Sequence, residues 1–127
     1  MKIAFDFHGV LETYPEQMKS LILALKGAHR IVVLSGPPSG ILRLELESCG
    51  YVEGFHYSQA LSVVDWLKAK GTSMHQHENG SWYCDDDIWW SSKARICEEQ
   101  DIDILFDDTL KYKEHIKNGK PLFLHIK

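Results

Sequence analysis

Four polar residues stand directly after apolar runs, at points far apart in the chain. Asp6 follows the run IAF, Ser35 follows VVL, and Asp107 and Asp108 follow ILF. A carboxylate can attack phosphorus, a hydroxyl can donate a hydrogen bond to a phosphoryl oxygen, and neighbouring carboxylates can hold a divalent cation. Each residue by itself is more typical of a turn or a helix cap. In combination they indicate phosphate chemistry.

These side chains can act together only if the strands before them share one sheet. Apolar runs alternate with segments of helical period along the chain, a pattern typical of an α/β protein with a parallel sheet. Ligands of such sheets bind beyond the carboxyl ends of the strands. We expect residues 1–127 to form one domain, with a small hairpin excursion near 72–87.

The pattern also predicts where the elements lie. Strands are expected at 2–7, 30–34, 54–57, 101–106 and 121–126, the last at a sheet edge because it begins with Pro121. Helices are expected at 15–27, 42–50, 60–71 and 91–100, the last capped by Ser91 or Ser92. The dipeptide Asn79-Gly80 favours a hairpin with a two-residue turn.

Four motifs follow one another along the chain: FDFHGVL, VVLSG, Lys93 on a predicted helix, and ILFDDT. They resemble the four successive motifs of the haloacid dehalogenase superfamily, from Asp6 to Asp108. The usual first motif of that family is aspartate, any residue, aspartate, glycine, and this chain departs from it at His8. The resemblance implies a three-layer, Rossmann-like fold with a minimal cap, as in a small capless phosphatase.

The resemblance also implies roles for the acidic residues. Asp6 would be the nucleophile and would form an aspartyl-phosphate that water then hydrolyses. One oxygen of Asp6, the backbone carbonyl of His8, and Asp107 or Asp108 would hold Mg²⁺, with Asp108 favoured as the direct ligand. Hard oxygen ligands suit magnesium, and a cation screens the repulsion between a carboxylate and a phosphate.

Three further residues would bind the phosphate. The hydroxyl of Ser35 and the amide of Gly36 would donate hydrogen bonds to phosphoryl oxygens, and Lys93 would neutralise the charge of the nucleophile and the phosphate. The alternatives are that Ser35 only begins the turn GPPSG and that Lys93 is one of fourteen lysines and arginines in solvent. The presence of all the motifs favours the functional interpretation.

His8 stands where phosphatases of this family usually have the aspartate that protonates the leaving group. The metal contact from this position is made by the main chain, so we expect the histidine to spare Mg²⁺ binding. Imidazole can do acid-base work near neutral pH. Three outcomes stay open: a phosphatase that uses His8, a family member with non-phosphatase chemistry, or a phosphate-binding or interaction domain with little turnover.

The spacing of the motifs leaves little room for a cap. Only residues 12–30 separate the first motif from the second strand, and residues 72–87 alone are left for a miniature lid. We therefore expect an open site, which favours a substrate that supplies its own cover, such as a macromolecular end, or a small molecule held by a partner subunit. The expected substrate class is a nucleotide or sugar phosphate.

The segment around WYCDDDIWW raises two secondary hypotheses. Its aromatic residues could stack a base or, more simply, cover the sheet. Asp85 to Asp87 are expected to be a solvated run and helix cap. His75 and His77, with Cys84 across a hairpin, form a weak zinc hypothesis because a fourth ligand and a recognised spacing are missing.

Composition and charge limit the binding partners and the cellular location that we expect. The net charge of −4 argues against long nucleic acid, and no apolar run reaches the roughly 20 residues of a membrane span. Three cysteines without a CxxC pair suggest reduced thiols, and with no signal-like segment they favour a cytoplasmic protein. The oligomeric state is left open.

Overall fold

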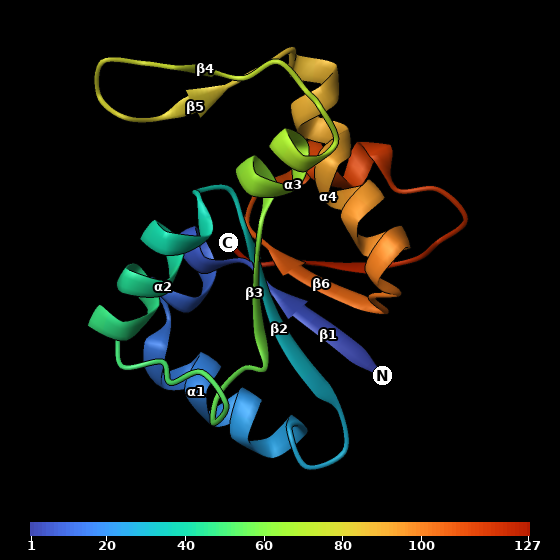
Figure 1. Ribbon diagram of the computed structural model, residues 1–127. Coiled ribbons are helices and arrows are strands. Elements are labelled where there is room, and N and C mark those ends of the chain that lie inside the picture. The colour runs from blue at the N-terminus through green and yellow to red at the C-terminus, as the bar shows by residue number, and fades with distance from the viewer.

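The computed structural model describes residues 1–127 and has a five-stranded parallel sheet at its centre (Figure 1). The strand order is β3-β2-β1-β6-β7, and every neighbouring pair is parallel. The strands are β1 (Lys2–Phe5), β2 (Arg30–Ser35), β3 (Gln59–Ser62), β6 (Ile104–Asp107) and β7 (Leu122–His125). The chain builds outward from β1 in one direction and then returns to its other side, so the strand order reverses between β1 and β6. Ligand sites of open α/β sheets lie at such a reversal.

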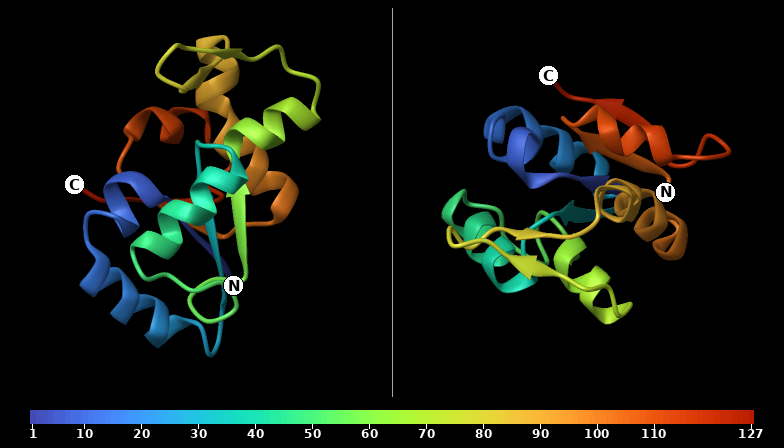
Figure 2. Two further views of the ribbon diagram at one scale, coloured as in Figure 1. Left: turned by 60° about the vertical axis from the view of Figure 1, so that its left-hand side comes forward. Right: turned by 90° about the horizontal axis from the view of Figure 1, so that it is seen from above.

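Helices cover both faces of the sheet, as Figures 1 and 2 show. They are α1 (Pro15–Leu25), α2 (Ser39–Ser48), α3 (Val63–Ala69) and α4 (Asp86–Gln100). Ile3 and Phe5 pack with α1 and α2, whereas Ala4 packs with α3 and α4. This alternation follows from the two-residue period of a strand. The expected three-layer, Rossmann-like α/β fold with a parallel central sheet is confirmed.

The central strands are apolar throughout because both of their faces are buried. Residues 31–34 of β2 are each at most 3% exposed. Phe5 of β1 stacks on Phe106 of β6, with ring centroids 4.5 Å apart. Each large apolar side chain that is buried in this way contributes about 1.5–3 kcal/mol. The rigid sheet holds the ends of β1, β2 and β6 in fixed positions.

The third strand begins later than the sequence predicts. The expected strand at 54–57 is instead a turn, with Gly54 at φ +85° and a single bridge between Glu53 and Tyr57. The strand is residues 59–62, and Ala60 belongs to it rather than to the next helix. Ser62 caps α3 by accepting a hydrogen bond from the Asp65 amide at 3.0 Å. Only two residues of this short strand, Ala60 and Leu61, are apolar, so its signal is weak beside the helical pattern that follows.

The helix that carries Lys93 also differs from expectation. α4 begins at Asp86, with Asp85 at the N-cap position, rather than at Ser91 or Ser92. Acidic residues in the first turn interact favourably with the helix dipole, which explains the earlier start. Asp85 to Asp87 are exposed at the start of the helix, as expected, although the Asp85 side chain makes no capping hydrogen bond. The expected edge position of the last strand, β7, is also confirmed.

Two short strands form the hairpin, β4 (His75–Gln76) and β5 (Trp82–Tyr83). The His77 amide bonds to the Ser81 carbonyl and the Gly80 amide to the His77 carbonyl, which leaves a three-residue loop. Gly80 adopts φ +89°, whereas Asn79 keeps an ordinary φ. The two-residue Asn-Gly turn that the sequence predicts is thus wrong, because that turn needs positive φ at both residues.

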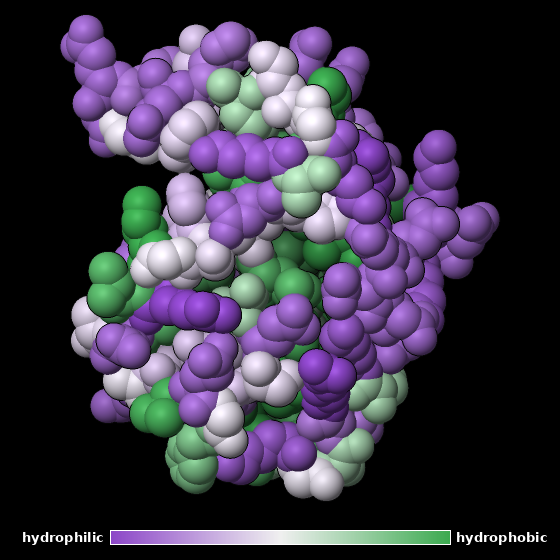
Figure 3. All heavy atoms as spheres, in the orientation of Figure 1, coloured by the Kyte–Doolittle hydropathy of each residue, from purple (hydrophilic) through white to green (hydrophobic).

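The hairpin projects from the end of the molecule at which the parallel strands finish, above α2 and α3 (Figures 1 and 2). In the space-filling view it is mainly hydrophilic, and a hollow separates it from α2 (Figure 3). No helix of the protein combines the length and the apolar character that crossing a bilayer requires.

Candidate functional site

A pocket of about 260 Å³ opens at the carboxyl edge of the sheet, where the strand order reverses. It brings together most of the residues that the sequence singles out. Its lining comprises Asp6, His8, Gly9, Ser35, Gly36, Pro37, Lys93, Asp108, Thr109 and Tyr112. Asp107 lies directly behind this lining and is fully buried. The residues come from the ends of β1, β2 and β6, from the turns that follow β1 and β6, and from α4.

Asp6 leaves the sheet at the end of its central strand. Its backbone is extended (φ −68°, ψ 155°), and its amide donates to the Phe106 carbonyl of β6 at 2.9 Å. The Phe7 amide donates to Asp6 Oδ1 at 2.8 Å, at the start of the tight helical turn η1 (Phe7–Leu11). Asp6 is only 5% exposed. The turn therefore holds the Asp6 carboxylate at the carboxyl edge of the sheet, with limited access to water.

Gly9 permits this turn. Its φ is +79°, a conformation that side chains rarely adopt. A Cβ placed at Gly9 would lie 2.1 Å from Asp108 Oδ2. The first turn and the end of β6 thus approach so closely that only glycine fits between them.

Lys93 from α4 lies between two carboxylates at the floor of the pocket. Its Nζ is 2.5 Å from Asp107 Oδ2 and 3.4 Å from Asp6 Oδ1. The ammonium group also lies 4.3 Å from the centre of the Tyr112 ring. Removing either member of the closest pair, Lys93 and Asp107, typically costs about 3–5 kcal/mol because it leaves the other charge buried. The three charges are therefore held in a mutually dependent arrangement.

The electrostatics of this cluster follow from its burial. Burial raises the pKa of Asp6 to about 6, and the negative charge of Asp107 adds to the effect, although Lys93 and hydrogen bonds from Ser35 and Phe7 oppose it. Burial alone would lower the pKa of Lys93, but the charges of Asp6 and Asp107 raise it well above its usual range. Lys93 is thus a permanent cation, and Asp6 is a carboxylate that holds its proton unusually tightly.

The two adjacent acids at the end of β6 have different environments. Asp107 has both oxygens engaged, one by Lys93 and the other by the Thr109 amide at 2.9 Å. Asp108 is exposed on the pocket wall, and its Oδ1 accepts a hydrogen bond from the Thr109 hydroxyl at 3.2 Å. Asp108 therefore has the greater freedom to accept a further ligand.

The acidic residues form a set that suits a hard cation. Asp6, Asp107 and Asp108 each offer an oxygen, and these atoms lie within 4.8 Å of one another. Carboxylate oxygens are the type of ligand that suits Mg²⁺, which prefers one or two carboxylates together with water and substrate oxygens. The donor set is thus compatible with the expected magnesium site.

Ser35 and Gly36 form the opposite wall of the pocket. Ser35 ends β2, is 1% exposed and lines the pocket together with Asp6. A Cβ at Gly36 would lie 3.3 Å from the Trp89 ring, which therefore packs closely on this loop. The Gly36 carbonyl accepts from the Val64 amide at 3.1 Å. The loop is held from α3 and from α4.

His8 occupies the rim of the pocket rather than its floor. Its side chain is 46% exposed, and its Nε2 lies 2.6 Å from Glu45 Oε2 on α2. Its ring also meets the Phe7 ring edge-on, with centroids 5.0 Å apart. Glu45 and Tyr112 are site residues that the sequence did not indicate, because α2 and η2 (Leu110–His115) reach the pocket only through folding. Thr109 follows the two acids directly and could have been predicted as their partner.

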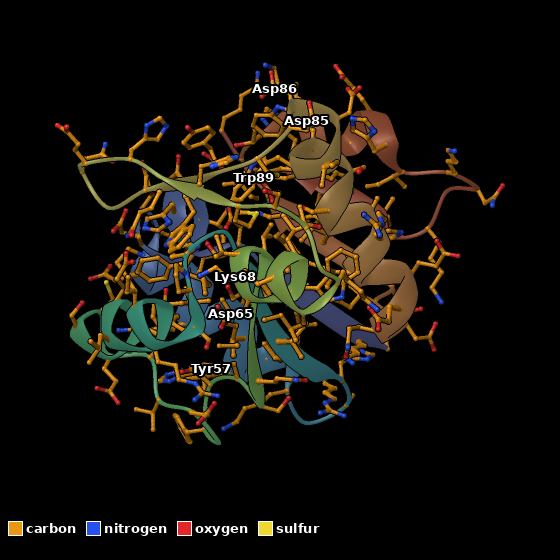
Figure 4. The ribbon with its side chains drawn as sticks, turned by 45° about the horizontal axis from the view of Figure 1, so that its top comes forward. Tyr57, Asp65, Lys68, Asp85, Asp86 and Trp89 are labelled. Carbon is orange, nitrogen blue, oxygen red and sulfur yellow. The ribbon has the colours of Figure 1, made fainter.

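The aromatic residues near α4 do not form one surface. Trp82 lies against Lys68 of α3, with Nζ 3.5 Å from its ring centre, and Trp90 packs edge-on against Tyr112. Figure 4 shows Lys68 on α3 and Trp89 near the start of α4. Trp82 and Trp90 therefore pack against other parts of the protein, which fits the expected covering role better than it fits the stacking of a base.

The zinc hypothesis on the hairpin is wrong in its geometry. His75 pairs with Tyr83 across the hairpin, and the His77 ring stacks on the Tyr83 ring at 4.2 Å. Cys84, the next residue, points into the hydrophobic core with α3 and α4. The cysteine and the exposed histidines are therefore not gathered around one point, because successive side chains of a strand face opposite sides.

A larger hollow, about 600 Å³, lies elsewhere, between the outer side of α4 and residues 115–120. Two of its cations are engaged already. Lys120 pairs with Asp101 and Asp103 at 2.8 and 3.1 Å, and Arg95 lies over the Trp66 ring. The smaller pocket beside Asp6 is consequently the candidate site, since it alone combines a buried cation, carboxylates and donors.

Comparisons of the chain with models of protein families, with curated proteins and with solved structures gave no match.

Proposed function

We propose that this protein is a Mg²⁺-dependent phosphohydrolase that cleaves a phosphate monoester through an aspartyl-phosphate on Asp6. The observation that carries the proposal is the buried cluster of Asp6, Lys93 and Asp107 at the floor of an open pocket. A carboxylate held against a permanent cation at the switch point of a parallel sheet is costly to maintain for structure alone. The cluster supplies a nucleophile and the charge that an incoming phosphate needs.

Asp6 and Asp108, with the backbone carbonyl of His8, are the proposed holders of Mg²⁺. The ion supplies positive charge that lets a carboxylate approach an anionic phosphate. Asp107 acts mainly through Lys93, because both of its oxygens are already engaged. Its task is to hold the ammonium group of Lys93 beside Asp6.

The first chemical step joins Asp6 to the substrate. An oxygen of Asp6 attacks phosphorus, the bond between phosphorus and the leaving oxygen breaks, and the His8 ring gives a proton to that oxygen. The Ser35 hydroxyl, the Gly36 amide and Lys93 stabilise the phosphoryl oxygens as their charge develops. The leaving alcohol then departs through the open mouth of the pocket.

The second step regenerates the carboxylate. Water attacks phosphorus in the aspartyl-phosphate, its proton passes to His8, and the bond between Asp6 and phosphorus breaks. Inorganic phosphate leaves and His8 is protonated again. The substrate class proposed is a small nucleotide or sugar phosphate, with the hairpin of β4 and β5 as a minimal cap, and a screen of phosphorylated metabolites would identify it.

The decisive experiment measures hydrolysis of an aryl phosphate with and without Mg²⁺. The parent is expected to turn over only with the metal, and Asp6→Asn is expected to be inactive. Asp87→Asn, an exposed acid in the first turn of α4, is the matched control and should behave as the parent. When the aryl phosphate carries a radiolabelled phosphoryl group, rapid acid quenching during turnover should trap labelled aspartyl-phosphate on the parent. Asp6→Asn should carry no label. Activity that survives in Asp6→Asn would overturn the mechanism.

Variants at His8 test the proton transfer separately. His8→Ala should lower kcat by about 100-fold or more, which is the usual contribution of a general acid. His8→Asp should keep or raise the activity, because a carboxyl group at this position can move the same proton. Equal rates for His8→Ala and the parent would remove His8 from the chemistry. A parent that binds phosphate without turnover would indicate a binding domain instead.

A further inference from the structure

One hydrogen bond at the rim of the pocket connects two elements that lie far apart in the sequence. His8 Nε2 and Glu45 Oε2 are 2.6 Å apart, although 37 positions separate the two residues. Glu45 lies in the second half of α2, the helix that packs on the same face of the sheet as Phe5 and Phe7. The bond therefore exists only because the fold places α2 beside the first turn.

The chemistry of the pair determines which ring nitrogen carries a proton. An ionised carboxylate only accepts hydrogen bonds, so Nε2 must be the donor. When the ring is neutral, Nδ1 is then the nitrogen with a free lone pair, and it has no partner in the protein. A carboxylate that holds one imidazole nitrogen in this way sets both the tautomer and the direction of the ring.

We propose that Glu45 is a positioning residue for His8, which it orients through Nε2 so that Nδ1 is the atom that exchanges protons with the substrate. The proposal rests on the function proposed above. Glu45 does not touch the reacting atoms. It acts by keeping the His8 ring in one orientation and one tautomer through both steps.

The location of the pair distinguishes it from an ordinary surface ion pair, which adds little to stability. His8 lines the pocket and follows Asp6 by two residues. Its backbone is extended (φ −67°, ψ 130°), and Gly9 after it is also non-helical, so no helical packing restrains the His8 side chain. Only the edge of the Phe7 ring and the carboxylate of Glu45 are in place to orient it.

Glu12 provides a matched control. Potential ligand atoms of His8, Glu12 and Glu45 lie within 4.8 Å of one another, yet only Glu45 hydrogen-bonds to the ring. Both acids carry the same charge near His8. An effect of general negative charge would therefore follow from removing either one, whereas orientation through a hydrogen bond would depend on Glu45 alone.

The first test reads the tautomer without any turnover. In the metal-free protein at alkaline pH, the ¹⁵N shifts of His8 should report a ring protonated at Nε2. Glu45→Ala should convert this to a mixture of tautomers, and Glu12→Ala should leave it unchanged. A mixture already in the parent, an unchanged ring in Glu45→Ala, or equal changes in both variants would overturn the proposal.

The second test is a double-mutant cycle on hydrolysis of an aryl phosphate with Mg²⁺. Glu45→Ala should lower kcat roughly 10-fold or more with little change in KM, and Glu12→Ala should not. In the His8→Ala background, loss of Glu45 should have no further effect. An equal loss of kcat with and without His8 would mean that Glu45 acts only on the structure, and would overturn the proposal.

The two tests separate this inference from the proposed function. A parent without turnover would overturn the phosphatase, and the ¹⁵N shifts alone would then decide whether Glu45 sets the His8 tautomer. An active parent whose His8 ring is indifferent to Glu45 would overturn the positioning role and leave the phosphatase standing.

Discussion

At the scale of single residues, the pocket is organised by three buried charges that sum to one negative charge. Asp6 and Asp107 together outnumber Lys93, and all three are at most 5% exposed. Such an excess of charge is unfavourable in the absence of a cation. Active sites commonly keep arrangements that reduce stability, because the same groups are needed in that place for function.

This imbalance predicts a pH dependence in the metal-free protein. The pKa of Asp6 is raised from 3.8 to about 6, so the folded protein binds this proton more tightly than the unfolded chain. The contribution of Asp6 to the free energy of unfolding therefore falls as the pH rises from about 4 to about 7, by about 3 kcal/mol in total. Asp6→Asn should lack this decrease and should be the more stable protein at pH 8.

Urea unfolding of both proteins across this pH range, with chelator present, measures the difference directly. Subtracting the unfolding free energy of the variant from that of the parent at each pH cancels the titration of the groups that the substitution does not affect. Identical pH profiles would show that Asp6 titrates normally. Addition of Mg²⁺ at pH 8 should stabilise the parent more than Asp6→Asn, because only the parent offers the carboxylate to the ion.

Gly9 gives a second prediction at this scale. Gly9→Ala should cost stability through its positive φ and should also displace Asp108, whose Oδ2 would lie 2.1 Å from the new Cβ. Gly71 has φ +82° and no atom within 4 Å of a Cβ, so Gly71→Ala isolates the cost of φ alone, about 1 kcal/mol. Calorimetric titration should show weaker Mg²⁺ binding for Gly9→Ala than for Gly71→Ala. Equal affinities in the two variants would contradict the contact with Asp108.

At the scale of elements, α4 links the core to the site. Its inner face carries Ile96 and Cys97 into the core, and one turn earlier the same face carries Lys93 to the pocket. The residue i+3 from Lys93 is Ile96, so both side chains share one face of the helix. The packing of α4 on the core therefore determines how deeply the Lys93 ammonium group is buried in the pocket.

The hairpin of β4 and β5 is expected to be separable from the fold. Its residues are mostly exposed, and its identified contact with the body is the one between Trp82 and Lys68. His75 pairs with Tyr83, so the chain can be closed by replacing 75–83 with Asn-Gly. The variant should lose about 1 kcal/mol or less of unfolding free energy in urea, which is the value of an exposed cation–π contact.

Trp82→Ala is the matched control for that excision, because it removes the contact and keeps the hairpin. Both variants should unfold with the same midpoint. A hairpin deletion that abolishes cooperative unfolding, with Trp82→Ala intact, would show that the hairpin belongs to the core.

At the scale of the whole molecule, stability should be graded from the sheet outward. β1 lies between β2 and β6, and its side chains reach both hydrophobic clusters. Its amides should therefore exchange with deuterium only through global unfolding, whereas those of β4 and β5 should exchange with little protection. Native-state exchange measured residue by residue checks this order. Rapid exchange in β1 would contradict a single cooperative core.

The sequence by itself determined the layers and most of the strands. Runs such as RIVVL are apolar at every position, and that pattern suits a parallel strand buried on both faces. It also indicated that Asp6, Ser35 and Asp108 would meet, because carboxyl ends of parallel strands share one edge, whereas Lys93 on α4 was expected there only from the resemblance of the motifs. The start of α4 and the position of β3 were predicted wrongly, since acidic residues in the first turn of α4 and the register of β3 with β2 outweighed the local apolar pattern.

Only the tertiary structure decided which partner each charge has. Nothing in the order of residues says that Lys93 binds Asp107 more closely than Asp6, or that Glu45 of α2 reaches His8. These choices depend on distances of a few ångströms between elements that are remote in the chain. The energy of a charge depends steeply on such distances and on burial, so they follow from packing rather than from sequence patterns.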